Sequence, residues 1–186
     1  MKGKWPAWFV AAFGALCLGG CATTTVNFDK LPNGTPVVSQ SQSVLQGNAV
    51  NPQSIVSTQY ASEGLEFTSG GPGVFAASFS PDVPSAPNAA CPTGANNTAN
   101  FSATTKIKVS ANNICNAWVT ITSTSGPTTM KAFDVSGNQI GPTVSSSGSA
   151  PGRLGAAERL HINACDINEI QLSGVNYCFD DVSIRR

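Results

Sequence analysis

The chain has 186 residues, of which only 11% are charged, and its ten basic and ten acidic residues cancel to a formal net charge of zero. The basic residues form no block, so the composition excludes a protein that binds nucleic acid through a cationic surface. The length is suited to one domain with a substantial core.

The first twenty residues have the pattern of an export signal. Lys2 and Lys4 make the start positive, and the apolar run of residues 5–18 is shorter than the about 20 residues that span a bilayer. The run ends in "LGGC", in which small residues precede Cys21. This arrangement resembles the lipobox of bacterial lipoproteins, although Gly19 stands where Ala or Ser is more usual. The alternative is an ordinary signal peptide cut nearby, which would leave Cys21 as a plain thiol.

The lipoprotein resemblance implies three regions: a signal peptide of residues 1–20, a lipid anchor and spacer of residues 21–25, and a domain of residues 26–186. Cys21 would carry a diacyl group, with a further chain such as palmitate on its amine. At about 0.8 kcal/mol per buried CH2, such chains hold a protein on a membrane. Ala22 follows the cysteine where Asp would retain a lipoprotein in the inner membrane. We therefore expect a protein of the bacterial cell envelope, in the outer rather than the inner membrane.

The rest of the chain is rich in Thr, Ser, Val, Gly and Asn and consists of short β-prone runs separated by turn residues. The predicted strands are residues 25–29, 65–68, 74–79, 106–110, 118–122, 130–135, 139–144, 158–163, 167–172 and 177–184. No run predicts a helix longer than one turn. The pattern favours an all-β sandwich. Residues 39–58 and 80–100 lack a lasting periodicity and are predicted to be surface loops.

Several of these runs have the period of two that is typical of a half-buried strand. Apolar and polar residues alternate through residues 106–110, and in residues 118–122 Val119 and Ile121 share one face while Trp118 shares the other with two threonines. Because its strand is predicted to be central, we expect Trp118 to lie in the core. Gly137 and Asn138 predict a hairpin between residues 130–135 and 139–144.

Four cysteines follow the lipobox: Cys91, Cys115, Cys165 and Cys178. An even number in an exported protein indicates two disulfides, for which three pairings exist. We favour Cys91 with Cys115 and Cys165 with Cys178. A C-x-x-C spacing does not occur among them, which argues against a zinc site.

The two ends of the domain carry the remaining charged motif. Asp29 precedes a Pro-Asn-Gly turn by a few residues, and Asp180 and Asp181 are adjacent in the last predicted strand. If the first and last strands pair, the three carboxylates and the turn carbonyls converge into an oxygen-rich site of the kind that Ca2+ prefers. Lys30 offers an alternative, because its ammonium group can neutralise these carboxylates by a salt bridge.

Five motifs occur in an order that resembles bacterial jelly-roll domains of the galactose-binding-like or carbohydrate-binding-module type. They are "FDKLPNGTPV", "QYASEGLEF", "MKAFDVSGNQIG", "INEIQLSG" and "CFDDVSI". The resemblance implies an antiparallel jelly-roll β-sandwich, a structural Ca2+ between the chain ends and recognition of a glycan. Asp29, Asp180 and Asp181 match the positions expected to bind the ion, with carbonyls near Leu31 and Gly34 as helpers. Lys30 departs from the family, which often has an acidic residue there.

Catalytic residues are harder to find in this sequence. His161 is the only histidine, and the alternation of apolar residues around it predicts that its side chain faces outward. The sequence has no G-x-S-x-G motif that would supply a catalytic serine. Trp118, Tyr60 and Tyr177 are the candidate aromatic platforms for a sugar, although Tyr60 matches a structural family position. We therefore expect a non-enzymatic lipoprotein whose partners are the membrane and a glycan. The alternatives are a structural or protein-interaction module of the envelope and, as a minor one, a hydrolase with paired carboxylates.

Overall fold

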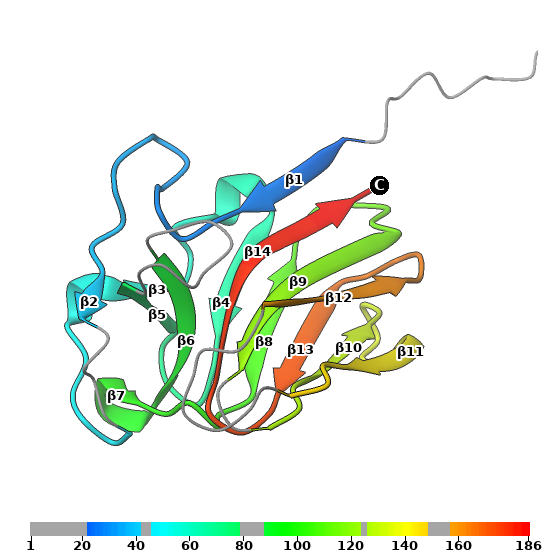
Figure 1. Ribbon diagram of the computed structural model, residues 1–186. Helices are drawn as coiled ribbons and strands as arrows, with labels where there is room; N and C mark the ends of the chain where they lie inside the picture. Colours follow the sequence, from blue (N-terminus) through cyan, green and yellow to red (C-terminus); the bar gives the residue numbers. More distant parts are fainter. Residues whose placement is uncertain (1–21, 42–45, 79–87, 124–125, 149–156) are drawn as a thin grey trace, which may run out of the picture.

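The computed structural model describes residues 22–41, 46–78, 88–123, 126–148 and 157–186. The predicted signal peptide and Cys21 lie outside the described residues. Within them the protein is an all-β sandwich of two sheets that pack face to face around one core (Figure 1). The described residues include three single-turn 3-10 helices, and none of their helices is long and apolar enough to cross a membrane. The predicted fold class is confirmed.

The larger sheet has nine strands in the order β12-β9-β14-β6-β5-β2, with β1, β3 and β7 paired to β14, β5 and β6. Its strands are β1 (Thr23–Val26), β2 (Gln40–Ser41), β3 (Ile55–Val56), β5 (Val74–Ser78), β6 (Asn88–Gly94), β7 (Thr98–Ala99), β9 (Asn116–Ser123), β12 (Glu158–Asn163) and β14 (Tyr177–Arg185). All of these pairs are antiparallel except β2 with β5. The two-residue strands β2 and β3 are the only strands in the described part of the loop predicted for residues 39–58.

The smaller sheet has five antiparallel strands in the order β11-β10-β13-β8-β4. They are β4 (Leu65–Thr68), β8 (Thr105–Val109), β10 (Thr129–Phe133), β11 (Gln139–Ser145) and β13 (Glu169–Ser173). The 3-10 helices are η1 (Pro52–Ser54), η2 (Ala61–Glu63) and η3 (Ala95–Asn97). From β8 onward the chain passes repeatedly between the sheets, so that neighbouring strands come from distant parts of the sequence, as in a jelly roll.

The core is formed by the inward-facing residues of both sheets. In β8 the buried Ile107 and Val109 alternate with exposed lysines, as predicted. Near the first strand, Phe28 packs its ring against the edges or faces of Tyr60, Phe67 and Phe179 at centroid distances of 5.4–6.0 Å. Such aromatic pairs add about 0.5–1.5 kcal/mol each to the burial of their surface.

The first and last strands lie side by side, as expected. β1 pairs with β14 in an antiparallel register that runs from Thr23 opposite Arg185 to Val26 opposite Val182 (Figure 1). The register of β14 with β9 shifts between Asp180 and Ser183, so the terminal aspartates lie at a β-bulge. A bulge re-aims the side chains beside it.

One predicted loop contains a central strand, and that prediction was wrong. Residues 88–94 form β6, which lies between β5 and β14 and is buried along its whole length. A strand that is covered on both faces does not need to alternate apolar and polar residues. Here its outer side is covered by a second apolar cluster, which includes Val50, Phe75 and Phe101. Small residues such as Ala89 and Ala90 fit between these layers, and the same small residues made the segment look like a loop.

The favoured disulfide pairing was also wrong. The bonds join Cys91 to Cys178 and Cys115 to Cys165. The register that places Ala90 opposite Phe179 puts Cys91 opposite Cys178 on β6 and β14. Cys115 and Cys165 flank the paired strands β9 and β12. The pairing follows strand neighbours, whereas the prediction followed nearness in sequence.

Candidate functional site

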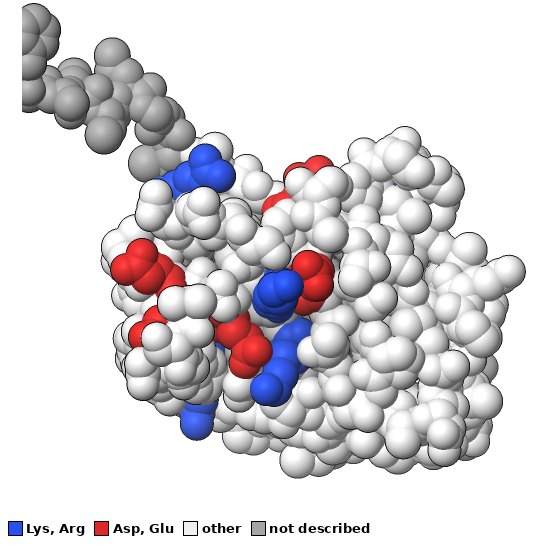
Figure 2. Space-filling view, turned by 180° about the vertical axis from the view of Figure 1, so that it is seen from behind, with Lys and Arg blue, Asp and Glu red and all other residues white. Residues whose placement is uncertain are grey.

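The solvent side of the smaller sheet carries two rows of polar side chains, which we call the polar sheet face. The cross-strand register places Thr68, Lys106, Gln171 and Lys131 in one row and Glu66, Lys108, Glu169 and Phe133 in the next. These residues alternate with buried ones such as Phe67 and Ile107, so their side chains point away from the core. Figure 2, seen from behind, shows basic and acidic side chains gathered next to a broad uncharged surface.

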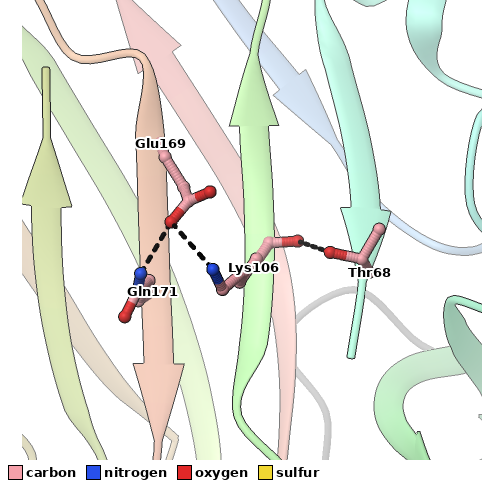
Figure 3. Close-up of polar contacts among 4 residues, drawn as sticks. All are labelled: Thr68, Lys106, Glu169 and Gln171. Carbon is pink, nitrogen blue, oxygen red and sulfur yellow. Dashed lines mark hydrogen bonds and ion pairs between the residues drawn. The ribbon is translucent and has the colours of Figure 1, made fainter. Parts of the chain in front are cut away.

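Two lysines of the polar sheet face are paired with carboxylates. Lys106 Nζ lies 3.8 Å from Glu169 Oε1, and Lys108 Nζ lies 3.4 Å from Glu66 Oε1. Gln171 Nε2 donates a hydrogen bond of 2.6 Å to the same Glu169 oxygen, and Figure 3 shows Lys106 and Gln171 meeting at this carboxylate. The face therefore presents fixed donors and acceptors with little net charge.

The edge of this face is held by a rigid turn. Asp134 accepts hydrogen bonds from the backbone N–H groups of Ser136 and Asn138, at 2.9 and 2.8 Å. The side-chain amide of Asn138 donates a hydrogen bond to the second carboxylate oxygen of Asp134. Together these bonds hold the pKa of Asp134 below its usual value. The predicted hairpin is confirmed, and it fixes the position of the half-buried Phe133 at the end of the second row.

Acidic residues from the two chain ends meet at the bulge of β14. Asp29 Oδ1 accepts a 3.0 Å hydrogen bond from the backbone N–H of Asn88, and the buried Asp180 accepts one of 2.8 Å from the N–H of Asp181. Asp181 has a φ of +45°. Ala90 lies opposite Phe179, so the antiparallel β6 runs from there toward Asn88 while β14 runs toward Asp180 and Asp181.

The charges of these groups act on one another and on Tyr60. Burial and the negative charge of Asp181 raise the pKa of Asp29, while the hydrogen bond from Asn88 and the charge of Lys30 lower it. Burial, followed by the charges of Asp29 and Asp180, also raises the pKa of the Tyr60 hydroxyl. Asp29 and Asp181 therefore repel each other across a partly desolvated gap.

The residues present partly fit a cation at this place. Among the residues that the structure describes, no three His, Cys, Asp or Glu side chains are grouped closely enough to hold a metal ion. An amide oxygen is also a ligand for Ca2+, and Asn88 Oδ1 is buried without a hydrogen-bond partner in the described chain. Sequence reasoning missed Asn88, because it lies in the segment that looked like a loop.

The sequence-predicted aromatic platforms fall in different places. Tyr60 and Tyr177 are buried, at 2% and 0% exposure, and both belong to the core. Trp118 was expected in the core, but it faces outward on β9, where it is half-buried and stacks on the exposed His161 with a centroid distance of 4.6 Å. The prediction erred because the inward positions of β9 are taken by Ala117, Val119 and Ile121.

Two glutamates of the polar sheet face are engaged in ion pairs. Glu66 and Glu169 lie two strands apart on the polar sheet face, and each is ion-paired to a lysine. A pocket of about 210 Å3 lies beside Lys30 and Glu63, next to Tyr60. It is smaller than the about 300–1,000 Å3 that is usual for a small-molecule site. Glu63 is the one glutamate among the described residues that line it.

Comparisons with known proteins are sparse. No protein-family model matches the sequence, and no curated protein is significantly similar to it. Among solved structures, the chain is similar to a mutant of CBM29-2, a family 29 carbohydrate-binding module, with a TM-score of 0.42 and 7% sequence identity over 88% of this chain and 92% of that one. A superposition this loose carries no argument about function.

Proposed function

We propose that the protein is a lipid-anchored lipoprotein of the bacterial cell envelope whose non-catalytic sandwich binds an uncharged glycan on the polar sheet face. The observation that supports it is the double row of donors and acceptors across β4, β8, β13 and β10. Sugar hydroxyls both donate and accept hydrogen bonds, so paired lysines, carboxylates and an amide suit them. Phe133 supplies an apolar surface for a sugar ring at the end of the row.

Preorganisation strengthens this proposal. Glu169 is held by contacts with Lys106 and Gln171 of the same face, so a sugar would meet side chains whose positions are fixed (Figure 3). Fixed partners reduce the entropy lost on binding. Since the two ion pairs cancel most of the charge, a neutral ligand suits the face better than an ionic one.

The test is binding of neutral oligosaccharides, by array screening and then calorimetry, to a chain that begins at Ala22. Replacing Gln171→Ala removes one amide and frees Glu169, and we expect affinity to fall about threefold to tenfold, as for the loss of one hydrogen bond. Gln53→Ala is the matched control, since Gln53 is exposed on η1 outside the polar sheet face. If no oligosaccharide binds at millimolar concentration, the glycan proposal fails and the protein-interaction alternative replaces it.

The anchor is tested separately. Labelling of cells with radioactive palmitate should mark the wild-type protein, and Cys21→Ser should abolish the label and release the protein from the membrane fraction. A Cys21→Ser protein that remains labelled and membrane-bound would contradict the lipoprotein assignment. This result is independent of whether the polar sheet face binds a glycan.

We also propose that a structural Ca2+ binds at Asp29 and the terminal aspartates, with Asn88 as an amide ligand. The unpartnered Asn88 oxygen and the repulsion between Asp29 and Asp181 support it, since a cation would satisfy the first and relieve the second. Asp180 was counted with these ligands from the sequence, and it lies directly beside Asp181 at the bulge. A bound ion would tie the first segment of the domain to its last strand.

Thermal unfolding in EDTA and in millimolar calcium tests this proposal. A ligand present at about 100 times its dissociation constant stabilises the folded state by about 2.7 kcal/mol. Asp181→Asn should remove most of that gain without forbidding the positive φ, which Asn tolerates. Asp166→Asn is the matched control, because Asp166 also has a positive φ and is exposed. Equal unfolding temperatures in EDTA and calcium would show that the aspartates bind no ion.

A further inference from the structure

A cationic aromatic cluster lies on the outer face of the larger sheet, and we call it the Trp118 patch. It consists of Trp118, His161, Arg159 and Arg185. The Trp118 and His161 rings stack with an interplanar angle of 5°, and His161 Nε2 lies 3.1 Å from Asn116 Oδ1. The guanidinium carbons of Arg159 and Arg185 lie 5.5 and 5.1 Å from the centre of the indole.

Within the described chain, the arginines of this patch are not paired with carboxylates, unlike Lys106 and Lys108 on the polar sheet face. Neither Arg159 nor Arg185 forms a salt bridge among the residues that the structure describes. Arg185 Nε is buried and lacks a hydrogen-bond partner within the same part of the chain. Arg159 and His161 are exposed, and Trp118 is half-buried. The patch therefore offers unused donors around an aromatic ring, which suits a partner rich in phosphate oxygens.

The place of the patch relative to Cys21 identifies that partner. Arg185 is directly opposite Thr23 in the β1–β14 pair, so their Cα atoms are about 5 Å apart. Thr23 follows Cys21 by two residues, which span at most about 7 Å of extended chain. An acyl chain on Cys21 would hold Arg185 within about 12 Å of the membrane surface. The adjacent register, Thr25–Ser183–Trp118–His161, continues the patch from β1 across the sheet.

From this geometry we infer that the Trp118 patch is a second membrane contact, which binds lipid phosphates and orients the anchored domain on the bilayer. Trp is enriched at the membrane interface because its ring is apolar and its N–H is polar. Each Arg near an anionic surface contributes attraction of its own, and the covalent anchor raises the local concentration of headgroups around the patch. The inference rests on the proposed lipid anchor at Cys21.

Trp118 is the only tryptophan after the predicted signal peptide, so its fluorescence reports on the patch alone. A protein that begins at Cys21 keeps every described residue, and its other four cysteines are in disulfides. Its Cys21 thiol can be coupled to a maleimide lipid in vesicles of phosphatidylethanolamine and phosphatidylglycerol. This coupling places the tether at residue 21 whether or not cells acylate it, so the patch and the natural anchor are tested separately.

We expect the Trp118 emission to shift to shorter wavelength in these vesicles and to be quenched by lipids brominated near the headgroup. The double variant Arg159→Gln, Arg185→Gln should lower the ratio of membrane-bound to free orientations about 30-fold, the factor that corresponds to about 1 kcal/mol for each Arg. Lys131→Gln, which removes a cation from the polar sheet face, is the matched control and should leave the quenching unchanged.

Two results would overturn the inference. If the tethered protein emits as it does in buffer and is not quenched, the patch does not touch the bilayer, even where palmitate labelling shows the anchor to be real. If 10 mM inorganic phosphate abolishes the quenching at constant ionic strength, the patch recognises the free anion and not the lipid surface. Quenching in the tethered protein together with absence of labelling in cells would uphold the patch and contradict only the natural anchor.

Discussion

The hydroxyl of Tyr177 links the two sheets, and its removal should destabilise the fold by a calculable amount. It accepts a 3.0 Å hydrogen bond from the backbone N–H of Thr105 at the start of β8. It also lies 2.8 Å from the carbonyl oxygen of Ala103 and 3.0 Å from that of Leu172 in β13. Burial of this hydroxyl raises the pKa of Tyr177 to about 12. Tyr177 is thus protonated throughout the range in which the protein is studied.

Tyr177→Phe keeps the ring and its packing but removes the hydroxyl oxygen that accepts the hydrogen bond from the Thr105 N–H. Both residues are fully buried, so water cannot replace the lost partner. An unsatisfied buried donor costs about 1–3 kcal/mol. For a domain of this size each kcal/mol lowers the midpoint of thermal unfolding by about 2–4 °C, which gives a decrease of roughly 2–12 °C.

The assay is thermal and urea unfolding of the chain from Ala22 onward with its disulfides formed. Tyr60→Phe is the matched control, because the Tyr60 hydroxyl donates to the carbonyl oxygens of Asn27 and Lys30 and accepts no hydrogen bond from an N–H of the described chain. We expect Tyr60→Phe to cost less. If Tyr177→Phe is as stable as the wild type, or no less stable than Tyr60→Phe, the argument from buried donors is refuted.

Three further predictions concern the chain ends and the turns. The raised pKa of Asp29 means that its carboxylate destabilises the fold once ionised; in EDTA, stability should therefore fall as the pH rises from about 4 through the folded-state pKa, and Asp29→Asn should be more stable than wild type at pH 7. A pH-independent difference between the two would contradict this. Joint replacement of Cys91 and Cys178 by Ser, which opens a link between positions 87 residues apart, should cost about 4 kcal/mol in urea unfolding, and a loss below about 1 kcal/mol would refute the estimate. Gly141→Ala should cost about 1–2 kcal/mol, because Gly141 has a φ of +68° and an added Cβ would lie 2.9 Å from Ala164 Cβ; an unchanged midpoint would show that β11 relaxes freely.

Local patterns were sufficient to predict most strands, whereas features that depend on distant neighbours were missed. β4 and β12 were predicted to the residue, since their side chains alternate between solvent and a single core. β6 was missed because apolar residues cover it on both faces of the sheet. A strand buried in this way has no alternation of apolar and polar residues that the sequence could show. The disulfide pairing failed for the same reason, since strand order and not sequence distance determines which cysteines meet.

The candidate sites show the same difference between local patterns and contacts with distant parts of the chain. The polar sheet face follows from the alternation in residues 106–110, which is visible in the sequence. Convergence of Asp29 with the terminal aspartates was expected from pairing of the first and last strands, but Asn88 entered only through the missed strand. Trp118 was assigned to the wrong face because alternation shows which residues share a side without showing which side is inside.

The two proposed surfaces have a geometric consequence when taken together. The polar sheet face lies on the outer side of the smaller sheet, and the Trp118 patch lies on the outer side of the larger one, so the core of the sandwich separates them. A domain that rests on the bilayer through the Trp118 patch therefore directs the polar sheet face away from the lipid. Arg185 beside Thr23 makes the two contacts compatible, because the first described residues of β1 pair with the end of β14 that carries Arg185. A glycan-binding face needs this orientation, since a sandwich anchored by so short a spacer and lying on its smaller sheet would cover its own ligand site with lipid headgroups.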